Sequence, residues 1–151
     1  MPRFVIADAS VLIVLDKINQ LDLLKGVYKN IYTTPEIAEE YGNPIPAWIC
    51  IDSVRDKNYQ KVIETQVDKG EASAIALALE HKDSLLILDD LRARKVASRL
   101  GLIFTGTLGV INKAKSIGLI NKIKPLIDKL KTTDFRISDK VVDTILRKNN
   151  E

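Results

Sequence analysis

The sequence predicts an α/β fold built around a central parallel sheet. Short apolar and β-branched runs alternate with helix-forming stretches along its 151 residues, which is the pattern of a layered α/β domain. The run SLLIL at 84–88 is continuously apolar after Ser84, as is typical of a parallel strand that helices cover on both faces. We expect a single domain over 1–151, with about 121–151 forming a C-terminal helical extension.

The first half of the chain predicts three strands and four helices. Pro35 suits the first turn of a helix that ends at Gly42, and the helix-period aliphatic residues after Ser10 end at Gly26. The expected strands cover 4–8, 30–34 and 47–54, and the expected helices cover 10–26, 35–42, 56–70 and 71–82.

The second half continues the alternation and then becomes helical. Ser138 is a suitable N-cap for the last helix. The expected strands cover 84–90 and 102–106, the expected helices cover 91–101 and 107–118, and a helix, a turn and a second helix follow over 121–150.

The composition excludes several classes of protein. No apolar run reaches the roughly 18–20 residues of a membrane-spanning helix, and the N-terminal MPRFVIAD lacks the apolar core of a signal peptide. Cys50 is the only cysteine and His81 the only histidine, so neither an internal disulfide nor a Cys/His metal cluster can form. We therefore expect a cytoplasmic protein with no membrane partner.

The net charge of +3 is unevenly distributed. Residues 91–131 contain ten Lys or Arg and a single acid, Asp128, so the rest of the chain is net negative. This polarity suits a polyanion bound on one side and an acidic site elsewhere. Solvated faces of basic helices explain it equally well.

Acidic residues follow two of the predicted strands. Asp8 ends the first strand, and Asp89 and Asp90 end the SLLIL strand. Ligands of parallel α/β sheets bind at the carboxyl ends of the strands, so these acids converge if the two strands are neighbours. Clustered carboxylates take up protons or are held ionised by a divalent cation, and oxygen ligands suit Mg²⁺ or Mn²⁺.

Each acid also has a purely structural explanation. Glu71 suits a helix N-terminus, where it would favour the helix dipole, and the Asp89–Asp90 pair suits the cap of the next helix. Asp8 is harder to explain as a cap, because Ser10 is available for that role.

Several ordered motifs carry a resemblance to a known family. They are VIADASVLIVLDKINQLDLL, TTPEIAEEY, IPAWICI, the long stretch that begins DKGEASAIALALEHK and runs through LLILDDLRARKVASRLG to TGTLGV, and finally FRISDKVVDTIL. Over nearly its whole length the sequence resembles PIN-domain proteins, in particular the VapC-like toxins of prokaryotic toxin–antitoxin pairs. It is most similar to a subgroup with a GEA.AIALA helix and a TGTLGV turn.

This resemblance implies a three-layer α/β/α domain with a central parallel sheet and Mg²⁺- or Mn²⁺-dependent ribonuclease activity. The family pattern assigns the catalytic acids to Asp8, Glu40, Glu71 and Asp90. It assigns the metal contacts to Asp8, Glu71, Asp89 and Asp90, with hydroxyl groups from Ser10 and Thr107 beside them.

The assignment leaves some choices open. Many relatives have an aspartate as the third acid, so Asp68 is an alternative to Glu71. The helix pattern V..E selects Glu40 over Glu39, and Asp90 fits the fourth position best, with Asp89 close behind.

The expected partners are RNA, a second copy of the chain in a homodimer, and a small antitoxin protein that would cover the acidic pocket. Candidates for contacting the RNA backbone are Arg92, Arg94, Lys95 and Arg99. An aromatic content of 5% is too low to predict a broad base-stacking platform.

Two other functions remain alternatives. A phosphohydrolase with an aspartyl nucleophile would require an acid two residues after Asp8, where this chain has Ser10. A catalytically weak PIN fold that acts as an RNA-binding or scaffold protein is the second alternative, because the third acid departs from the common pattern.

Overall fold

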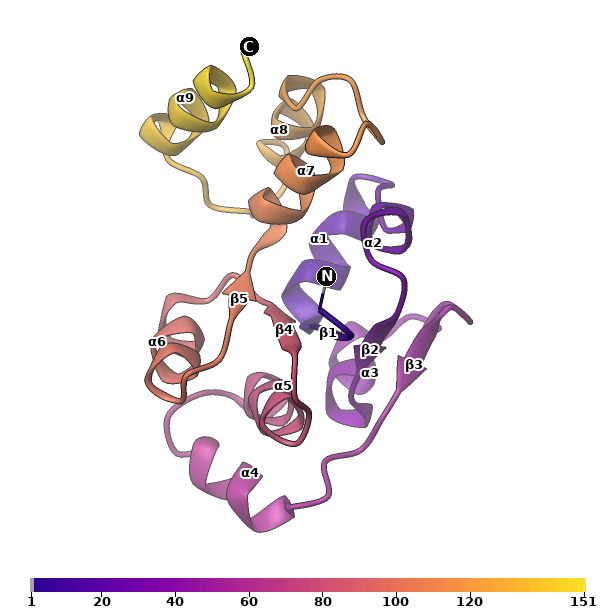
Figure 1. Ribbon diagram of the computed structural model, residues 1–151, viewed down its shortest axis with the longest axis vertical. Coiled ribbons are helices and arrows are strands. Elements are labelled where there is room, and N and C mark those ends of the chain that lie inside the picture. Colours follow the sequence, from indigo (N-terminus) through magenta and orange to yellow (C-terminus); the bar gives the residue numbers. More distant parts are fainter. Residues whose placement is uncertain (1) are drawn as a thin grey trace.

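The computed structural model describes residues 2–151 as a five-stranded sheet flanked by helices (Figure 1). All four strand pairings are parallel, and the strand order is β3-β2-β1-β4-β5. The strands are β1 (Phe4–Ala7), β2 (Ile31–Thr33), β3 (Ile49–Ile51), β4 (Ser84–Ile87) and β5 (Phe104–Thr105). The predicted α/β class with a central parallel sheet is confirmed.

The strand order reverses next to β1, and this reversal positions the site. The chain moves from β1 outward to β2 and β3, then returns to place β4 on the other side of β1. The two central strands pair in register, with Ala7 opposite Ile87, so both end at the same level. Such a reversal opens a crevice at the carboxyl edge of a parallel sheet, where ligands bind.

The core lies around these two central strands. All four residues of β1 are buried, as are the last three of β4, which is the burial expected of a sheet covered on both faces. Helix α5 (Lys69–Leu79) is buried from Ala72 to Ala78. Its four alanines in this stretch allow the helix to pack closely against β1, β4 and α3 (Pro35–Tyr41).

Two predicted helices are shorter than expected. The single helix predicted over 10–26 is wrong: α1 (Ala9–Lys17) and α2 (Asp22–Val27) are separated by Asn19, whose φ of 56° breaks the helix. The predicted helix over 56–70 ends early as α4 (Lys57–Ile63), because Asp68 caps a new helix, α5. The helical spacing of apolar residues in the sequence does not reveal such breaks.

The remaining helices begin and end close to the predicted positions. Thr34 caps α3, and Gly42 ends it with a φ of 77°. Helices α6 (Leu91–Arg99) and α7 (Thr107–Ser116) each follow a strand.

The C-terminal residues form α8 (Lys124–Leu130) and α9 (Asp139–Lys148), and the predicted cap at Ser138 is confirmed. Figure 1 shows α7, α8 and α9 grouped at one end of the molecule and α4 at the other. None of the helices described over residues 2–151 is both long and apolar enough to cross a membrane.

Candidate active site

Asp8 lies directly after β1 and is the most deeply buried acid of the site. Its backbone N–H donates to the Ile87 carbonyl at 3.0 Å, which fixes it against the end of β4. The side chain is only 3% exposed. Oδ2 accepts a hydrogen bond from the Ser10 hydroxyl at 3.1 Å, but Oδ1 is buried with no partner among residues 2–151. A buried oxygen without a partner is costly unless a proton or a cation satisfies it.

The electrostatics of Asp8 agree with its burial. The pKa of its carboxyl group is raised to about 7, mainly by loss of solvation and to a smaller extent by the charges of Glu40 and Asp68. Hydrogen bonds from the Ala9 backbone and from Ser10 oppose this rise. The site therefore favours either a protonated Asp8 or a cation beside it at neutral pH.

Glu71 lies on the first turn of α5, where several acidic side chains influence it. Its pKa is raised to about 8, first by burial and then by the negative charges of Asp68, Asp8 and Asp90. Glu71 also forms a capping box with Asp68: the Glu71 N–H donates to Asp68 Oδ1 at 2.8 Å, and the Asp68 N–H donates to Glu71 Oε1 at 3.3 Å. The capping role expected for a helix N-terminus is thus present alongside the electrostatic one.

The two aspartates after β4 point to different partners. Asp90 caps α6, with Oδ2 accepting from the Ala93 N–H at 2.9 Å, and its charge contributes to the raised pKa of Glu71. Asp89 instead accepts from the Thr107 N–H at 2.9 Å and from the Thr107 hydroxyl at 2.7 Å. Both oxygens of Asp89 are therefore engaged in joining the end of β4 to the start of α7.

Gly106 is required by this junction. A Cβ at this position would collide with Asp89 Oδ1 and with the Arg94 guanidinium group. The TGT sequence at 105–107 thus combines a close approach at the glycine with the hydroxyl of Thr107 that donates to Asp89.

Glu40 approaches the site from α3. Its Oε2 lies 3.1 Å from where a Cβ on Gly70 would be, which places the Glu40 carboxylate against the first turn of α5. Burial and the charge of Asp68 raise the pKa of Glu40. Glu39 instead lines a separate hollow with Lys57 and Gln60.

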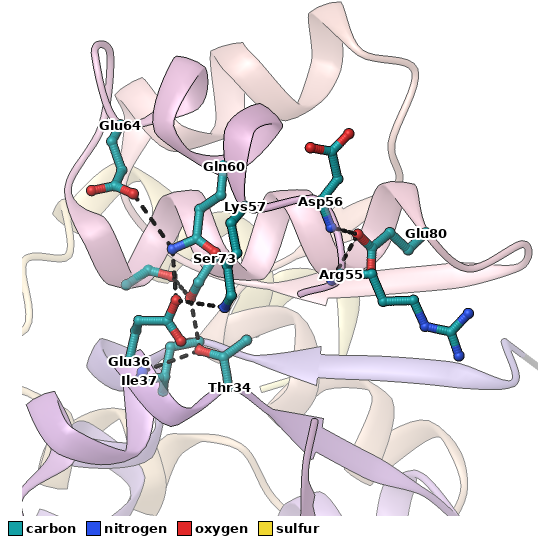
Figure 2. Close-up of polar contacts among 11 residues, drawn as sticks. Thr34, Glu36, Ile37, Arg55, Asp56, Lys57, Gln60, Glu64, Ser73 and Glu80 are labelled. Carbon is teal, nitrogen blue, oxygen red and sulfur yellow. Dashed lines mark hydrogen bonds and ion pairs between the residues drawn. The ribbon is translucent and has the colours of Figure 1, made fainter. Parts of the chain in front are cut away.

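A chain of buried hydroxyl groups joins the helices that carry Glu40 and Glu71 (Figure 2). The Ile37 N–H donates to Thr34 Oγ1 at 3.1 Å, the Thr34 and Ser73 hydroxyl oxygens are 2.7 Å apart, and the Ser73 hydroxyl donates to the Gly70 carbonyl at 2.6 Å. With Ser73 donating to Gly70, the Thr34 hydroxyl donates to Ser73. Every donor in this chain has an acceptor, so it holds α3 and α5 in a fixed relation.

Figure 2 also shows how α4 is fixed to the same helices. The Glu80 carboxylate accepts from the backbone N–H groups of Arg55 and Asp56, at distances of 2.8 to 3.0 Å, just before α4 begins. The buried Gln60 donates to Glu36 on α3 at 2.6 Å.

Sequence reasoning missed Thr34 and Ser73 and treated Asp68 only as an alternative. A threonine immediately before Pro35 signals a helix cap, but nothing in the sequence indicates that its hydroxyl also meets a serine 39 positions later. The cap of Asp68 on Glu71 was readable from the DKGE sequence.

The four predicted RNA-contacting cations all lie on α6 but differ in their surroundings. Arg94 donates through Nε to the Leu88 carbonyl at 2.9 Å, lies 3.7 Å from Asp89, and stacks over Phe104 at 5.3 Å from the ring centre. The other three side chains, those of Arg92, Lys95 and Arg99, are exposed. Arg94 therefore helps to build the sheet edge, while the others face solvent.

The donor chemistry of the site fits a hard divalent cation, but the side chains are not yet arranged around one. Asp8, Glu40, Glu71 and Asp90 offer only oxygen atoms, and the unpartnered Oδ1 of Asp8 is a vacant donor of this kind. In the part of the chain that the structure describes, no three Asp, Glu, His or Cys side chains form a group that could hold a metal ion. Shared coordination would thus require rotation of these carboxylate side chains.

The parallel α/β sheet and the acids at the carboxyl ends of its two central strands place the chain among α/β proteins with an acidic site at a strand-order reversal. The family model DUF3368, described as a PIN domain, matches residues 4–151, and the chain belongs to this family. PIN domains are generally nucleases that act on RNA and typically use divalent metal ions. No curated protein matches the chain.

Proposed function

We propose that this protein is a Mg²⁺- or Mn²⁺-dependent ribonuclease that hydrolyses RNA phosphodiester bonds at the carboxyl edge of β1 and β4. One observation carries the proposal: Asp8 is 3% exposed, and its Oδ1 has no partner among residues 2–151. Burying an ionisable group in this way lowers stability, and a cation bound by the carboxylate would offset that cost. Residues that serve only the fold are rarely left in this state.

Asp8, Glu71 and Asp90 are the proposed metal ligands. When bound, the metal would lower the pKa of a water molecule and offset negative charge on the scissile phosphate. The Ser10 hydroxyl donates a hydrogen bond to Asp8 Oδ2, which leaves Oδ1 as the oxygen atom that would bind the metal. Glu40, brought against α5, is proposed to accept a proton from the attacking water or to complete the ligand set.

Asp89 is proposed to act through position and not through metal contact. Its oxygens accept two hydrogen bonds from Thr107, and Arg94 lies within ion-pair distance. This arrangement leaves Asp90 as the acid after β4 that can turn toward Glu71.

The test is cleavage of a panel of RNAs by the purified chain. We expect cleavage with Mn²⁺ or Mg²⁺, loss of cleavage on chelation, and recovery when either metal is restored. Glu40→Gln should lower cleavage. Glu39→Gln is its matched control and should not, because Glu39 lines a different hollow. Cleavage that persists in chelator would refute the proposal. Failure of millimolar Mn²⁺ to raise the unfolding temperature would favour a scaffold protein instead.

We further propose that the chain is the toxin of a toxin–antitoxin pair and acts as a homodimer. The support is the resemblance of its ordered motifs to VapC-like proteins. Induced expression in a bacterial host should arrest growth, and the Asp8→Asn variant should not. Equal growth of both strains at equal protein levels would contradict the toxin role. Sedimentation analysis would measure the oligomeric state.

A further inference from the structure

The last turns of α7 and α9 meet the start of α8 at one place in the C-terminal part of the molecule. Asn149, just after α9, donates through its side-chain amide to Asn112 Oδ1 on α7 at 2.9 Å. Glu151 accepts from the Ile123 N–H at 2.9 Å and from Lys115 Nζ at 2.6 Å. These hydrogen bonds join three segments that are far apart in the sequence, in agreement with the grouping of α7, α8 and α9 in Figure 1.

Four exposed cations lie beside these contacts. Each is within two residues of Asn112, Ile123 or Asn149 along the chain, and consecutive Cα atoms are only about 3.8 Å apart. None of the four forms an ion pair within residues 2–151. This surface, here called the basic junction, consists of Lys113, Lys122, Arg147 and Lys148.

The acids at the same place do not neutralise these four charges. Glu151 is paired with Lys115 at 2.6 Å, and Asp128 is paired with Lys124 at 3.0 Å, so both acids already have a partner. Asp143, an exposed acid on α9, offsets one charge. Four cations and one acid leave the surface with a net charge of +3. A concentration of positive charge of this kind attracts polyanions.

The basic junction suits a phosphate backbone and not a nucleobase. Residues 107–131 and 139–151, which form α7, α8 and α9, contain no aromatic side chain. A base therefore has no ring to stack on in these helices. Lysine and arginine side chains instead pair with phosphate groups, with an affinity that depends on salt and not on base sequence.

Helix α7 connects the basic junction to the proposed catalytic acids. Its first residue, Thr107, donates to Asp89 at the end of β4. Lys113 is six residues further along, which is about 9 Å on the helix axis. None of the four cations lines the cleft of about 1000 Å³ that contains Glu71 and Asp90. An RNA bound at both places would therefore extend beyond the cleft along α7.

We propose that the basic junction is an anchoring surface for the RNA phosphate backbone, separate from the place of cleavage. It holds one part of a long RNA, whatever its sequence, while another part of the same strand lies over the acids. This inference rests on the proposed ribonuclease function, which makes RNA the expected polyanion. The C-terminal extension then lowers the KM for long RNA and contributes little to the chemical step.

The first test is RNA binding in chelator, where the proposed enzyme leaves the strand intact. The probe is an unstructured single strand longer than the roughly 4–16 nucleotides that one binding domain covers. Lys113→Gln/Lys148→Gln should weaken binding about 10-fold at roughly 0.15 M salt. It should also lower the slope of log K against log salt concentration by about 1.4, since each phosphate contact contributes about 0.7.

A control with the same change in charge separates this surface from general electrostatics. Lys61→Gln/Lys82→Gln also removes two exposed lysines, and Figure 1 shows α4, which carries Lys61, at the other end of the molecule. This variant should bind the RNA as the wild type does. Asp143→Lys adds positive charge on α9 and should tighten binding by about 4-fold or more, a gain that misfolding would not produce.

Cleavage provides a second readout that a purely structural role would not give. Lys113→Gln/Lys148→Gln should raise the KM for long RNA about 10-fold, with kcat close to that of the wild type. An RNA of about 4 nucleotides, too short to reach from the acids to the basic junction, should show no such rise.

Three results would overturn the inference. The first is an unchanged affinity and salt slope in Lys113→Gln/Lys148→Gln, and the second is an equal loss of binding in the two double variants. The third is binding to vesicles of phosphatidylserine and phosphatidylcholine that this variant loses while its RNA binding stays intact, which would assign the surface to a membrane. Each leaves the ribonuclease proposal standing. Absence of metal-dependent cleavage by the wild type would instead refute that proposal, and the binding assay alone would then decide whether the basic junction holds RNA.

Discussion

Two carboxylate environments in this chain are opposites. Asp8 is buried at the end of β1 with one oxygen unpartnered, and burial raises its pKa to about 7. Glu151 accepts from the backbone N–H groups of Ile123 and Lys124 and from Lys115 Nζ at 2.6 Å. Burial opposes ionisation there too, but these hydrogen bonds and the Lys115 charge lower the pKa of Glu151 to about 2.

The difference separates an acid whose charge is satisfied within the fold from one with an unpartnered oxygen, for which we propose a metal ion as the partner. Glu151 is satisfied by donors at the start of α8, so its charge stabilises the C-terminal helices. Asp8 and Glu71 lower the stability of the metal-free protein when they ionise, because their pKa values are raised. Raised pKa values of this kind are typical of functional sites.

The largest effect is expected from Asp8→Asn. Loss of a metal ligand should reduce ribonuclease activity by roughly 10³-fold, equivalent to about 4 kcal/mol of transition-state stabilisation. The same change should raise the free energy of unfolding of the metal-free protein at pH 8 by about 2 kcal/mol. Removing the buried ionised carboxylate stabilises the fold by about 4 kcal/mol. The amide that replaces it has no hydrogen-bond partner, which destabilises the fold by about 1–3 kcal/mol.

Urea unfolding in chelator measures the stability, and an RNA cleavage assay measures the activity. At pH 5 the stability difference should shrink, because Asp8 is then protonated in the folded wild type. A variant that loses activity and is also less stable at pH 8 would show that Asp8 is an ordinary structural residue.

The pH dependence of stability should have opposite signs at the two sites. The folded pKa of Asp8 is raised from 3.8 to about 7, so its stabilising contribution is complete below pH 3.8 and is lost as the pH rises through 7. Between pH 5 and pH 8 the metal-free protein should lose about 3 kcal/mol of stability through Asp8 alone. Glu71, with a pKa of about 8, acts in the same direction.

Glu151 acts in the opposite direction at a lower pH. Its folded pKa is lowered from 4.5 to about 2, so its contribution is complete above pH 4.5 and is lost as the pH falls toward 2. Saturating Mn²⁺ should flatten only the change between pH 5 and pH 8. A metal-free protein that is equally stable at pH 5 and pH 8 would contradict the raised pKa of Asp8.

The Asp89–Asp90 pair offers a sharper comparison between adjacent residues. Asp90→Asn should keep the cap on Ala93, since asparagine caps as well as aspartate, yet lower activity by about 10²-fold. Asp89→Asn should cost about 1–2 kcal/mol of stability, because its charged bonds to Thr107 and its pairing with Arg94 weaken. Activity per folded molecule should fall much less in Asp89→Asn. The reverse pattern would make Asp89 the metal ligand.

The C-terminal clamp, formed by the hydrogen bonds from Ile123, Lys124 and Lys115 to Glu151, should have a smaller effect than either acid of the site. Glu151→Gln should lower the free energy of unfolding by about 1–2 kcal/mol, as its hydrogen bonds to Ile123 and Lys124 lose their charge assistance. Asp143→Asn, an exposed acid on α9, is the control and should change stability by less than about 0.5 kcal/mol. Equal effects from the two variants would show that the clamp is not a distinct structural feature.

The sequence predicted the parallel sheet and the strand-end acids because both follow from local patterns. The continuous apolar run after Ser84 is typical of a strand covered on both faces, and Asp8, Asp89 and Asp90 follow the ends of predicted strands. The break at Asn19 was not predicted, because a single left-handed residue leaves the apolar period intact. The position of Phe135 in the cleft that Glu71 and Asp90 line was not predicted either. It depends on how the chain after α8 returns to these acids.

The sequence does not decide which of Asp89 and Asp90 would contact a metal ion, again because the answer depends on distant parts of the chain. Both follow β4, and only the path of α7 shows that Thr107 occupies Asp89. Long-range hydrogen bonds of this kind, like that between Thr34 and Ser73, have no signature in the spacing of residues.

The smallest effect is expected from the buried hydroxyl chain between α3 and α5. Ser73→Ala should cost about 1–2 kcal/mol of stability, because the Thr34 hydroxyl and the Gly70 carbonyl both lose a partner. If these hydroxyl groups also position Glu40 against Glu71, the variant should need an about 3-fold higher Mn²⁺ concentration for half-maximal activity. Its activity at saturating metal should change little. Thr34→Ser keeps both the cap on Ile37 and the bond to Ser73, so its metal requirement should match the wild type. A Ser73→Ala variant that is less stable but needs no more metal would contradict a role in metal binding. The buried hydroxyl groups would then stabilise the fold only, as the hydrogen bonds of Glu151 do.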